Sequence, residues 1–133
     1  MRVVLPGPST AIEVAFPADT ANMAIARSVA AAVATRADLT VDQIEDVRLA
    51  IDEATAYLIA HASPDARVLG RLWTDGHTFH ASLSCATESA SAPEPDPFSW
   101  TVLTALVSDI DRELVDGELV MHWVLARDHS VPA

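Results

Sequence analysis

The sequence is poor in the residues on which several protein classes depend. It has one cysteine, Cys85, which excludes an internal disulfide and a cysteine-rich zinc site. The apolar neighbours of this residue predict a buried thiol. No segment approaches the roughly 20 apolar residues of a membrane span, and the opening MRVVLPGPST has no apolar run of signal-peptide length. We therefore expect a cytoplasmic protein that makes no contact with a membrane.

Basic residues are also scarce, since 8 lysines and arginines stand against 19 aspartates and glutamates, for a net charge of −11. Affinity for nucleic acids comes largely from cationic side chains that neutralise phosphates, so direct binding to DNA or RNA is not expected. An acidic surface would attract a basic partner, such as a DNA-binding protein. It could equally serve solubility alone, and the composition does not decide between these two interpretations.

The five histidines do not form a recognisable metal site. No two of them have the H-x-x-x-H spacing of a helical zinc site, and His77 and His80, three residues apart in one hairpin, would face opposite sides of a strand. We expect surface histidines and no bound metal. A Ser/His/Asp arrangement with a nucleophile elbow is not recognisable either.

The length of 133 residues fits a single compact domain. We place it at residues 10–128, between a flexible leader (1–9) and a tail (129–133). Half of the residues are apolar and a fifth are charged, which is typical of an ordinary globular protein.

Hydrophobic periodicity changes early in the chain. Alternation predicts a strand over Thr10–Phe16, stopped by Pro17, and helical spacing then predicts a helix over Thr20–Arg36. One face of this helix carries apolar side chains that we expect to be buried: Ile25, Val29 and Val33. Another face is expected to point away from the core and to be available to a partner: Met23, Arg27 and Ala31.

A second helix is predicted from Thr40 to about Ala62. Thr40 and Gln43 have the spacing of a capping box, which satisfies free backbone donors at a helix start. The apolar residues at helical spacing predict a buried stripe: Ile44, Val47, Ile51, Ala54 and Leu58. A more polar side of the same helix carries Asp42, Asp46, Glu53 and Tyr57.

Two strands follow, Arg67–Thr74 and Thr78–Cys85. The pair Asp75-Gly76 between them suits a two-residue hairpin turn with positive φ angles. In the second strand every other residue is apolar or small, so one face is expected to face the core: Phe79, Ala81, Leu83 and Cys85.

The segment from Ala86 to Pro97 is small, acidic and rich in proline, so we expect a mobile loop. Helical spacing resumes from Phe98 to about Asp109, and Asp116-Gly117 then turns a final hairpin into a strand from Leu119 to Leu125. The order of elements is strand, two helices, two strands, helix and two strands. It predicts an α/β (α+β) two-layer sandwich, with helices on one face of a mixed, mostly antiparallel sheet.

One pair of polar residues could support chemistry. Glu53 and Tyr57 lie one helical turn apart, where a base and a neighbouring ligand could meet one substrate. This spacing alone is a weak signal, because a solvated glutamate and a half-buried tyrosine are common on helices.

The runs FPADTANMAIAR and DVRLAIDEATAYLI, with this order of elements, resemble the RsbW-type anti-sigma-factor serine kinases of the GHKL, or histidine-kinase-like, ATPase superfamily. The resemblance extends roughly from Ala11 to Arg127 and is more specific in the first half. It implies a Bergerat-type ATPase fold. Such proteins bind an alternative sigma factor and release it when an anti-anti-sigma partner takes its place. In kinase-active members, ATP phosphorylates that partner on serine.

The resemblance also assigns positions to a catalytic site. The family pattern on the second helix is Glu-x-x-x-Asn, with the glutamate as general base and the asparagine as magnesium ligand. Glu53 retains the glutamate, as a vestigial base, but Tyr57 stands at the asparagine position. A phenol replaces an amide oxygen poorly, because magnesium requires compact oxygen ligands in octahedral geometry.

Two glycine-rich boxes of the family are altered as well. At the Asp-x-Gly-x-Gly box that reads adenine, the chain has Cys85 followed by Ala-Thr-Glu-Ser. The second Gly-x-Gly, which opens the last helix against the phosphates, is replaced by Pro97, Phe98 and Ser99 before a tryptophan. Proline removes a backbone donor and the larger side chains occupy phosphate space. Without metal ligand, base reader and phosphate loop, little remains for phosphoryl transfer, so we expect neither a bound ATP-magnesium cofactor nor kinase activity.

The family match gives Arg27, with Met23 beside it, a role in binding the sigma factor and the competing anti-anti-sigma protein. The predicted function is therefore sequestration of a sigma factor by a homodimer, with release by partner competition. One alternative is an active ATP-dependent serine kinase that uses Glu53 as base. Another is a structural domain whose acidity serves solubility only.

Overall fold

The computed structural model describes residues 9–129, so most of the predicted leader and tail lies outside the described residues. Within this range the chain forms three α-helices and five strands in the predicted order. Their bounds are β1 (Ile12–Pro17), α1 (Met23–Ala34), α2 (Val41–Ala60), β2 (Arg67–Asp75), β3 (Thr78–Ala86), α3 (Pro97–Leu106), β4 (Asp109–Val115) and β5 (Glu118–Ala126). Across residues 9–129, no helix is long and apolar enough to cross a membrane.

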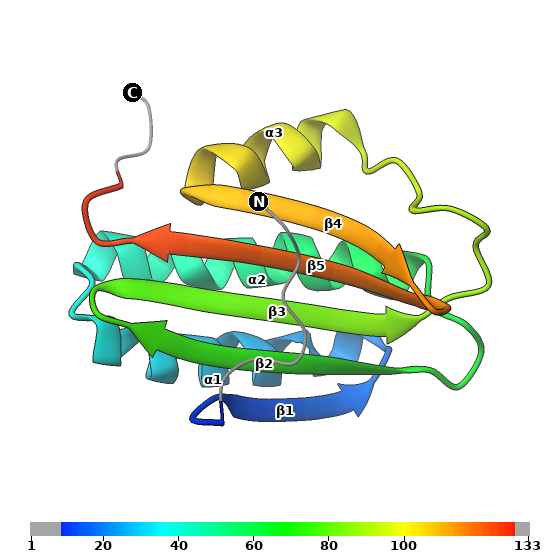
Figure 1. The fold of residues 1–133 in the computed structure, drawn as a ribbon, viewed down its shortest axis with the longest axis horizontal. Helices are drawn as coiled ribbons and strands as arrows, with labels where there is room; N and C mark the ends of the chain where they lie inside the picture. The colour runs from blue at the N-terminus through cyan, green and yellow to red at the C-terminus, as the bar shows by residue number, and fades with distance from the viewer. Residues whose placement is uncertain (1–8, 130–133) are drawn as a thin grey trace.

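The strands form one sheet in the order β1-β2-β3-β5-β4, and every neighbouring pair in it is antiparallel. Figure 1 shows α1 and α2 behind this sheet and α3 beside β4 at its edge. The predicted two-layer sandwich with a mostly antiparallel sheet is confirmed. The core lies between the helices and the sheet, and it includes the predicted inner face of β3: Phe79, Ala81, Leu83 and Cys85.

Helix α1 packs by a different face from the one predicted. Ile25 is 53% exposed and Val29 is only half-buried, so Val33 alone of the predicted stripe is buried. The buried face is made mainly of alanines, namely Ala26, Ala30, Ala31 and Ala34. Small side chains allow the helix backbone to approach the sheet closely, which a stripe of large aliphatic residues would prevent.

Helix α2 follows its prediction closely. The Thr40 hydroxyl accepts from the Gln43 amide at 3.1 Å, and the Gln43 side chain accepts from the Thr40 amide at 3.1 Å, so the capping box is present. Four of the five predicted stripe residues are fully buried: Val47, Ile51, Ala54 and Leu58. The helix packs against the sheet and also contacts α1 and α3.

The two hairpins differ in how well the sequence places their turns. At β4–β5 the central residues are Asp116 and Gly117, both with positive φ, as predicted. At β2–β3 the strands pair as far as Asp75 with Thr78, so the central residues are Gly76 and His77, one position later than predicted. Gly76 has a φ of 60°, and glycine at the first central position is the pattern of a type II′ turn.

The third helix is shorter than predicted. It ends at Leu106, and Val107 already has an extended backbone with φ of −113° and ψ of 162°. Asp109 and Ile110 consequently begin strand β4 instead of ending the helix. The apolar spacing of Leu103, Val107 and Ile110 continues across this break, because all three side chains pack against the same core.

The sheet face that points away from the helices carries an aromatic cluster. His80 stacks on Trp73 with ring centroids 5.0 Å apart, and His122 lies 5.8 Å from His80 and 5.7 Å from Trp73. His122 is 3% exposed and His80 is half-buried. The prediction of surface histidines is therefore wrong for these two, since their strand positions place them at the centre of a sheet face.

Candidate functional site

The positions that the resemblance assigns to the catalytic site come from three elements and one connecting segment. Glu53 and Tyr57 lie on α2, Cys85 lies on β3, and Pro97 and Ser99 form the first turn of α3. Residues 87–96, here called the strap, join β3 to α3 without forming a helix or strand.

Glu53 and Tyr57 are half-buried and one turn apart on α2. The Tyr57 hydroxyl donates to the Pro93 carbonyl of the strap at 2.5 Å. Burial raises the pKa of Tyr57, and the nearby Arg112 guanidinium opposes this shift. The phenol therefore keeps its proton and is committed to a carbonyl, which leaves it unsuited to bind a metal. The Glu53 side chain has no hydrogen bond or ion pair with any other residue of the range 9–129.

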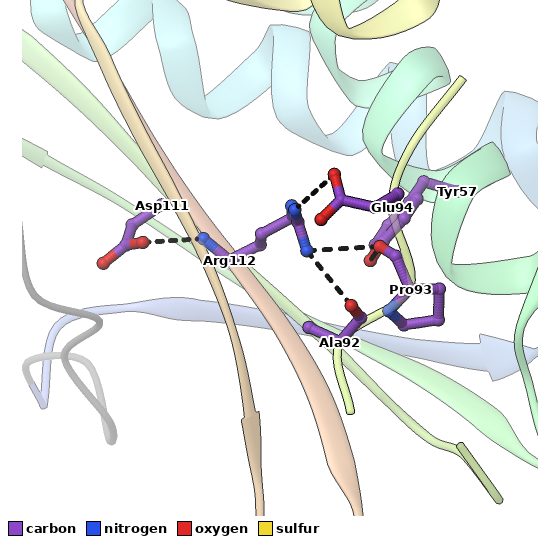
Figure 2. Close-up of polar contacts among 6 residues, drawn as sticks. All are labelled: Tyr57, Ala92, Pro93, Glu94, Asp111 and Arg112. Carbon is purple, nitrogen blue, oxygen red and sulfur yellow. Dashed lines mark hydrogen bonds and ion pairs between the residues drawn. The ribbon is translucent and has the colours of Figure 1, made fainter. Parts of the chain in front are cut away.

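Arg112 on β4 is the second residue that holds the strap. Its Nη1 donates to the carbonyls of Ala92 and Pro93 at 3.4 and 3.2 Å, and its Nη2 lies 3.2 Å from the Glu94 carboxylate. Figure 2 shows the Arg112 side chain directed at these strap residues, with Tyr57 reaching the same Pro93 carbonyl. The guanidinium also lies 5.7 Å from the centre of the Trp100 ring on α3, within the range of a cation–π contact.

The strap is held at its start as well. The Thr87 amide donates to the Gly117 carbonyl at 3.0 Å, and the Thr87 hydroxyl donates to the His61 carbonyl at 2.6 Å. The expected absence of regular structure is confirmed, and several hydrogen bonds tie the segment to its neighbours; its mobility stays a prediction. The composition of the segment indicated too little apolar area for it to fold by itself. Hydrogen-bond donors on other elements, Tyr57 on α2 and Arg112 on β4, hold it instead.

The N-terminus of α3 is closed by the chain's own carboxylate. The Asp96 side chain accepts from the Ser99 amide at 3.0 Å, and Pro97, which has no amide hydrogen, occupies the first helical turn. A helix N-terminus attracts anions through its free amides and its dipole. Here the carboxylate of Asp96 takes that place and would repel a phosphate.

Cys85 lies apart from these groups. Its side chain faces the helices and is 1% exposed, as the sequence predicts, and its cross-strand neighbours are Val68 and Leu119. Burial, and to a smaller extent the Glu118 carboxylate, raises the pKa of this thiol. A buried neutral thiol cannot read the amino group of adenine. The residues present therefore do not fit ATP and magnesium at the metal, base or phosphate position.

The predicted partner-binding residues lie on α1. Arg27 donates from Nε to both carboxylate oxygens of Asp52 on α2, at 2.9 and 3.2 Å. The Arg27 side chain is 37% exposed and that of Asp52 30%. Met23 is half-buried, but Ala31 is 4% exposed and packs inward. The face predicted to be free is thus open around Met23 and Arg27 and closed at Ala31.

Sequence reasoning missed Arg112 and Asp52. Each works through a contact between elements distant in the sequence, and Arg112 fell between the predicted helix end and the predicted Asp116-Gly117 turn, in a strand whose bounds the sequence did not indicate. The available signal for Arg112 was a lone cation inside the acidic run Asp109-Ile110-Asp111-Arg112-Glu113.

Comparison with known proteins identifies the family of the fold. Residues 16–97 match the family model of the histidine kinase-like ATPase domain, and the chain belongs to this family. It is also similar to the anti-sigma-F factor RsbW of Mycobacterium tuberculosis strains CDC 1551 / Oshkosh and ATCC 25618 / H37Rv. In each case the identity is 39% over 102 residues, which cover 75% of this chain and 60% of the relative's length.

The altered site leads to a prediction for nucleotide binding. Isothermal calorimetry with ATP and magnesium should give no measurable heat, because Tyr57, Cys85 and Asp96 occupy or block the three positions that the ligand needs. Adenosine, which carries no phosphate, serves as the control for base recognition alone. A dissociation constant in the low micromolar range would contradict this prediction.

Proposed function

We propose that the chain binds and sequesters a sigma factor, and that it releases the sigma factor when an anti-anti-sigma protein occupies the same surface. The observation that carries the proposal is the 39% identity to anti-sigma-F factor RsbW, in a chain whose own residues fill the nucleotide site. Because a sigma factor acts on RNA polymerase, this function places the chain in the cytoplasm.

The filled site supports binding without turnover. Tyr57, at the position of the family's metal ligand, donates to the strap, and Asp96 caps the helix that by the family resemblance should meet phosphate. Phosphoryl transfer depends on positioning and charge stabilisation around a metal-bound nucleotide. A switch does not need that reaction, since two ligands that compete for one surface displace each other by mass action.

The exposed part of α1 supports a role in partner binding. Met23 offers adaptable apolar area and Arg27 a guanidinium that can make paired bonds to a carboxylate. The net charge of −11 favours a partner whose surface is basic overall. We further propose a homodimer, by the family resemblance.

The test is to purify each sigma factor of the source organism and to measure its binding to the chain singly by biolayer interferometry. The tightest binder becomes the reference sigma factor. Failure of every sigma factor to bind with a dissociation constant below about 10 μM, or −7 kcal/mol, would reject the proposal and favour a domain whose acidity serves solubility.

Arg27→Ala should weaken binding of the reference sigma factor at least tenfold, because truncation of a buried arginine contact typically costs on the order of 2 kcal/mol. The free energy of unfolding should change by less than about 1 kcal/mol, since the Asp52 pair is partly solvated. The matched control is Arg36→Ala, which removes an exposed cation just after α1 and should leave the affinity unchanged. If Arg27→Ala binds the reference sigma factor as tightly as the wild type does, the interface lies elsewhere.

One observation favours the serine kinase as a second candidate. The Glu53 carboxylate is half-buried and makes no polar contact with the rest of residues 9–129, as a general base would require. Incubation with radiolabelled ATP and an anti-anti-sigma protein distinguishes the two functions. Phosphate transfer that disappears in Glu53→Ala would establish the kinase. Under the leading proposal there is no transfer, and Glu53→Ala binds the sigma factor as the wild type does.

A further inference from the structure

In the ion pair between Arg27 on α1 and Asp52 on α2, only one nitrogen of the guanidinium is used. Both Asp52 oxygens are bonded to Nε of Arg27, at 2.9 and 3.2 Å. The two terminal nitrogens, Nη1 and Nη2, make no hydrogen bond in the part of the chain that the structure describes. An arginine has five N–H donors in a fixed planar fork, so the outer edge of this guanidinium remains available while its inner nitrogen is held.

This arrangement removes freedom that a surface arginine ordinarily has. A free side chain of this length samples many rotamers, and ordering it on binding opposes association. The pair joins residues 25 positions apart on two packed helices, so the anchor is as rigid as the α1–α2 contact. Arg27 is therefore already ordered before any partner arrives.

We infer that Asp52 is a positioning residue for partner binding, which holds Arg27 with its terminal nitrogens facing the incoming protein. The inference rests on the proposed function. The group that fits the free edge is a carboxylate, because two parallel N–H donors match its two oxygens. Through this contact, one acidic side chain of the partner can bind to Arg27 although the surface of this chain is acidic overall.

The opposite role for Asp52 would be competition, in which it occupies the donors that a partner needs. That role requires the carboxylate to cover the Nη edge, whereas it covers Nε. The two roles predict opposite effects of removing the charge. If Asp52 positions Arg27, Asp52→Asn weakens binding; if it competes, the same change strengthens binding.

The experiment measures the affinity of Asp52→Asn for the reference sigma factor by biolayer interferometry. We expect a loss of about threefold to tenfold, the size of the coupling typical of neighbouring side chains in one contact. Asp52→Glu, which keeps the carboxylate one methylene further out, should recover most of the affinity. The matched control is Glu45→Gln, because Glu45 pairs with Arg48 at 3.2 Å on the same helix and its replacement removes the same charge.

A double-mutant cycle separates positioning from a general effect on the fold. In an Arg27→Ala background, Asp52→Asn should cause no further loss, since the residue acts only through Arg27. An equal loss in both backgrounds would show a structural role and overturn the inference, as would tighter binding by Asp52→Asn. If Arg27→Ala weakens binding but Asp52→Asn does not, the inference fails while the proposed function stands. If no sigma factor binds the wild-type chain, both fail.

Discussion

Arg112→Ala should lower the free energy of unfolding by about 2 to 4 kcal/mol and free the strap. The variant loses two carbonyl bonds from a charged donor, which together contribute roughly 1.5–3 kcal/mol, and a cation–π contact of about 0.5–1 kcal/mol with Trp100. The Glu94 pair adds little, because that carboxylate is 89% exposed. Urea unfolding measures the stability, and limited proteolysis measures how readily residues 88–96 are cut.

Tyr57→Phe is the matched control, because it removes one donor to the same Pro93 carbonyl and leaves Arg112 in place. Its cost should be about 1 kcal/mol, with most of the strap still protected. Freeing the strap should not create ATP binding, because Asp96 and Cys85 remain. Unchanged cleavage of the strap in Arg112→Ala would show that Arg112 is not needed to hold the segment.

Acidification from pH 7.5 to 5.5 should lower the free energy of unfolding by about 2 kcal/mol through His80 and His122. Burial lowers the pKa of both side chains; for His122 the neighbouring His80 adds to the effect, whereas Asp109 and Asp111 oppose it. A lowered pKa means that the unfolded chain binds protons that the folded chain refuses. Stability is therefore complete above the unfolded pKa of about 6.5 and falls as the pH drops below it.

The magnitude follows from the same linkage. Each histidine can contribute at most about 1.4 kcal/mol over this interval, and the partial exposure of His80 reduces its share. Urea midpoints measured at half-unit steps of pH give the slope. The variant His80→Phe/His122→Phe should show a clearly flatter slope. Asp46 works in the opposite direction at lower pH, because burial raises its pKa and the folded state then gains a proton more readily. A slope that is the same with and without the two histidines would contradict the assignment.

Local signals account for what could be predicted of the fold. The Thr40–Gln43 capping box, the Asp116-Gly117 turn and the alternation of β3 each depend on a few adjacent residues. Signals of this kind survive folding because nearby backbone groups make the same bonds in any context. They were sufficient for the order of all eight elements and for the two-layer architecture.

The errors of the sequence-based prediction lie where contacts between residues far apart in the sequence determine the structure. Periodicity favoured Ile25 for the core of α1, but close approach to the sheet selected alanines instead. The composition of the strap gave no sign of the contacts that Arg112 and Tyr57 make with Pro93, and its mobility stays a prediction. In the candidate site the identity of the altered positions was readable from the sequence. The internal groups that fill them, above all the Asp96 cap and the strap carbonyl, were not.

Cys85 is a natural probe of unfolding in this protein. Its thiol lies near the end of the central strand β3, on the face that the helices cover, is 1% exposed and has a raised pKa, so alkylating reagents that need an accessible thiolate cannot reach it in the folded state. Modification must wait until β3 separates from the helices. Since the sequence has no other cysteine, the labelling rate in plain buffer counts molecules that have opened globally, without denaturant and without an engineered probe.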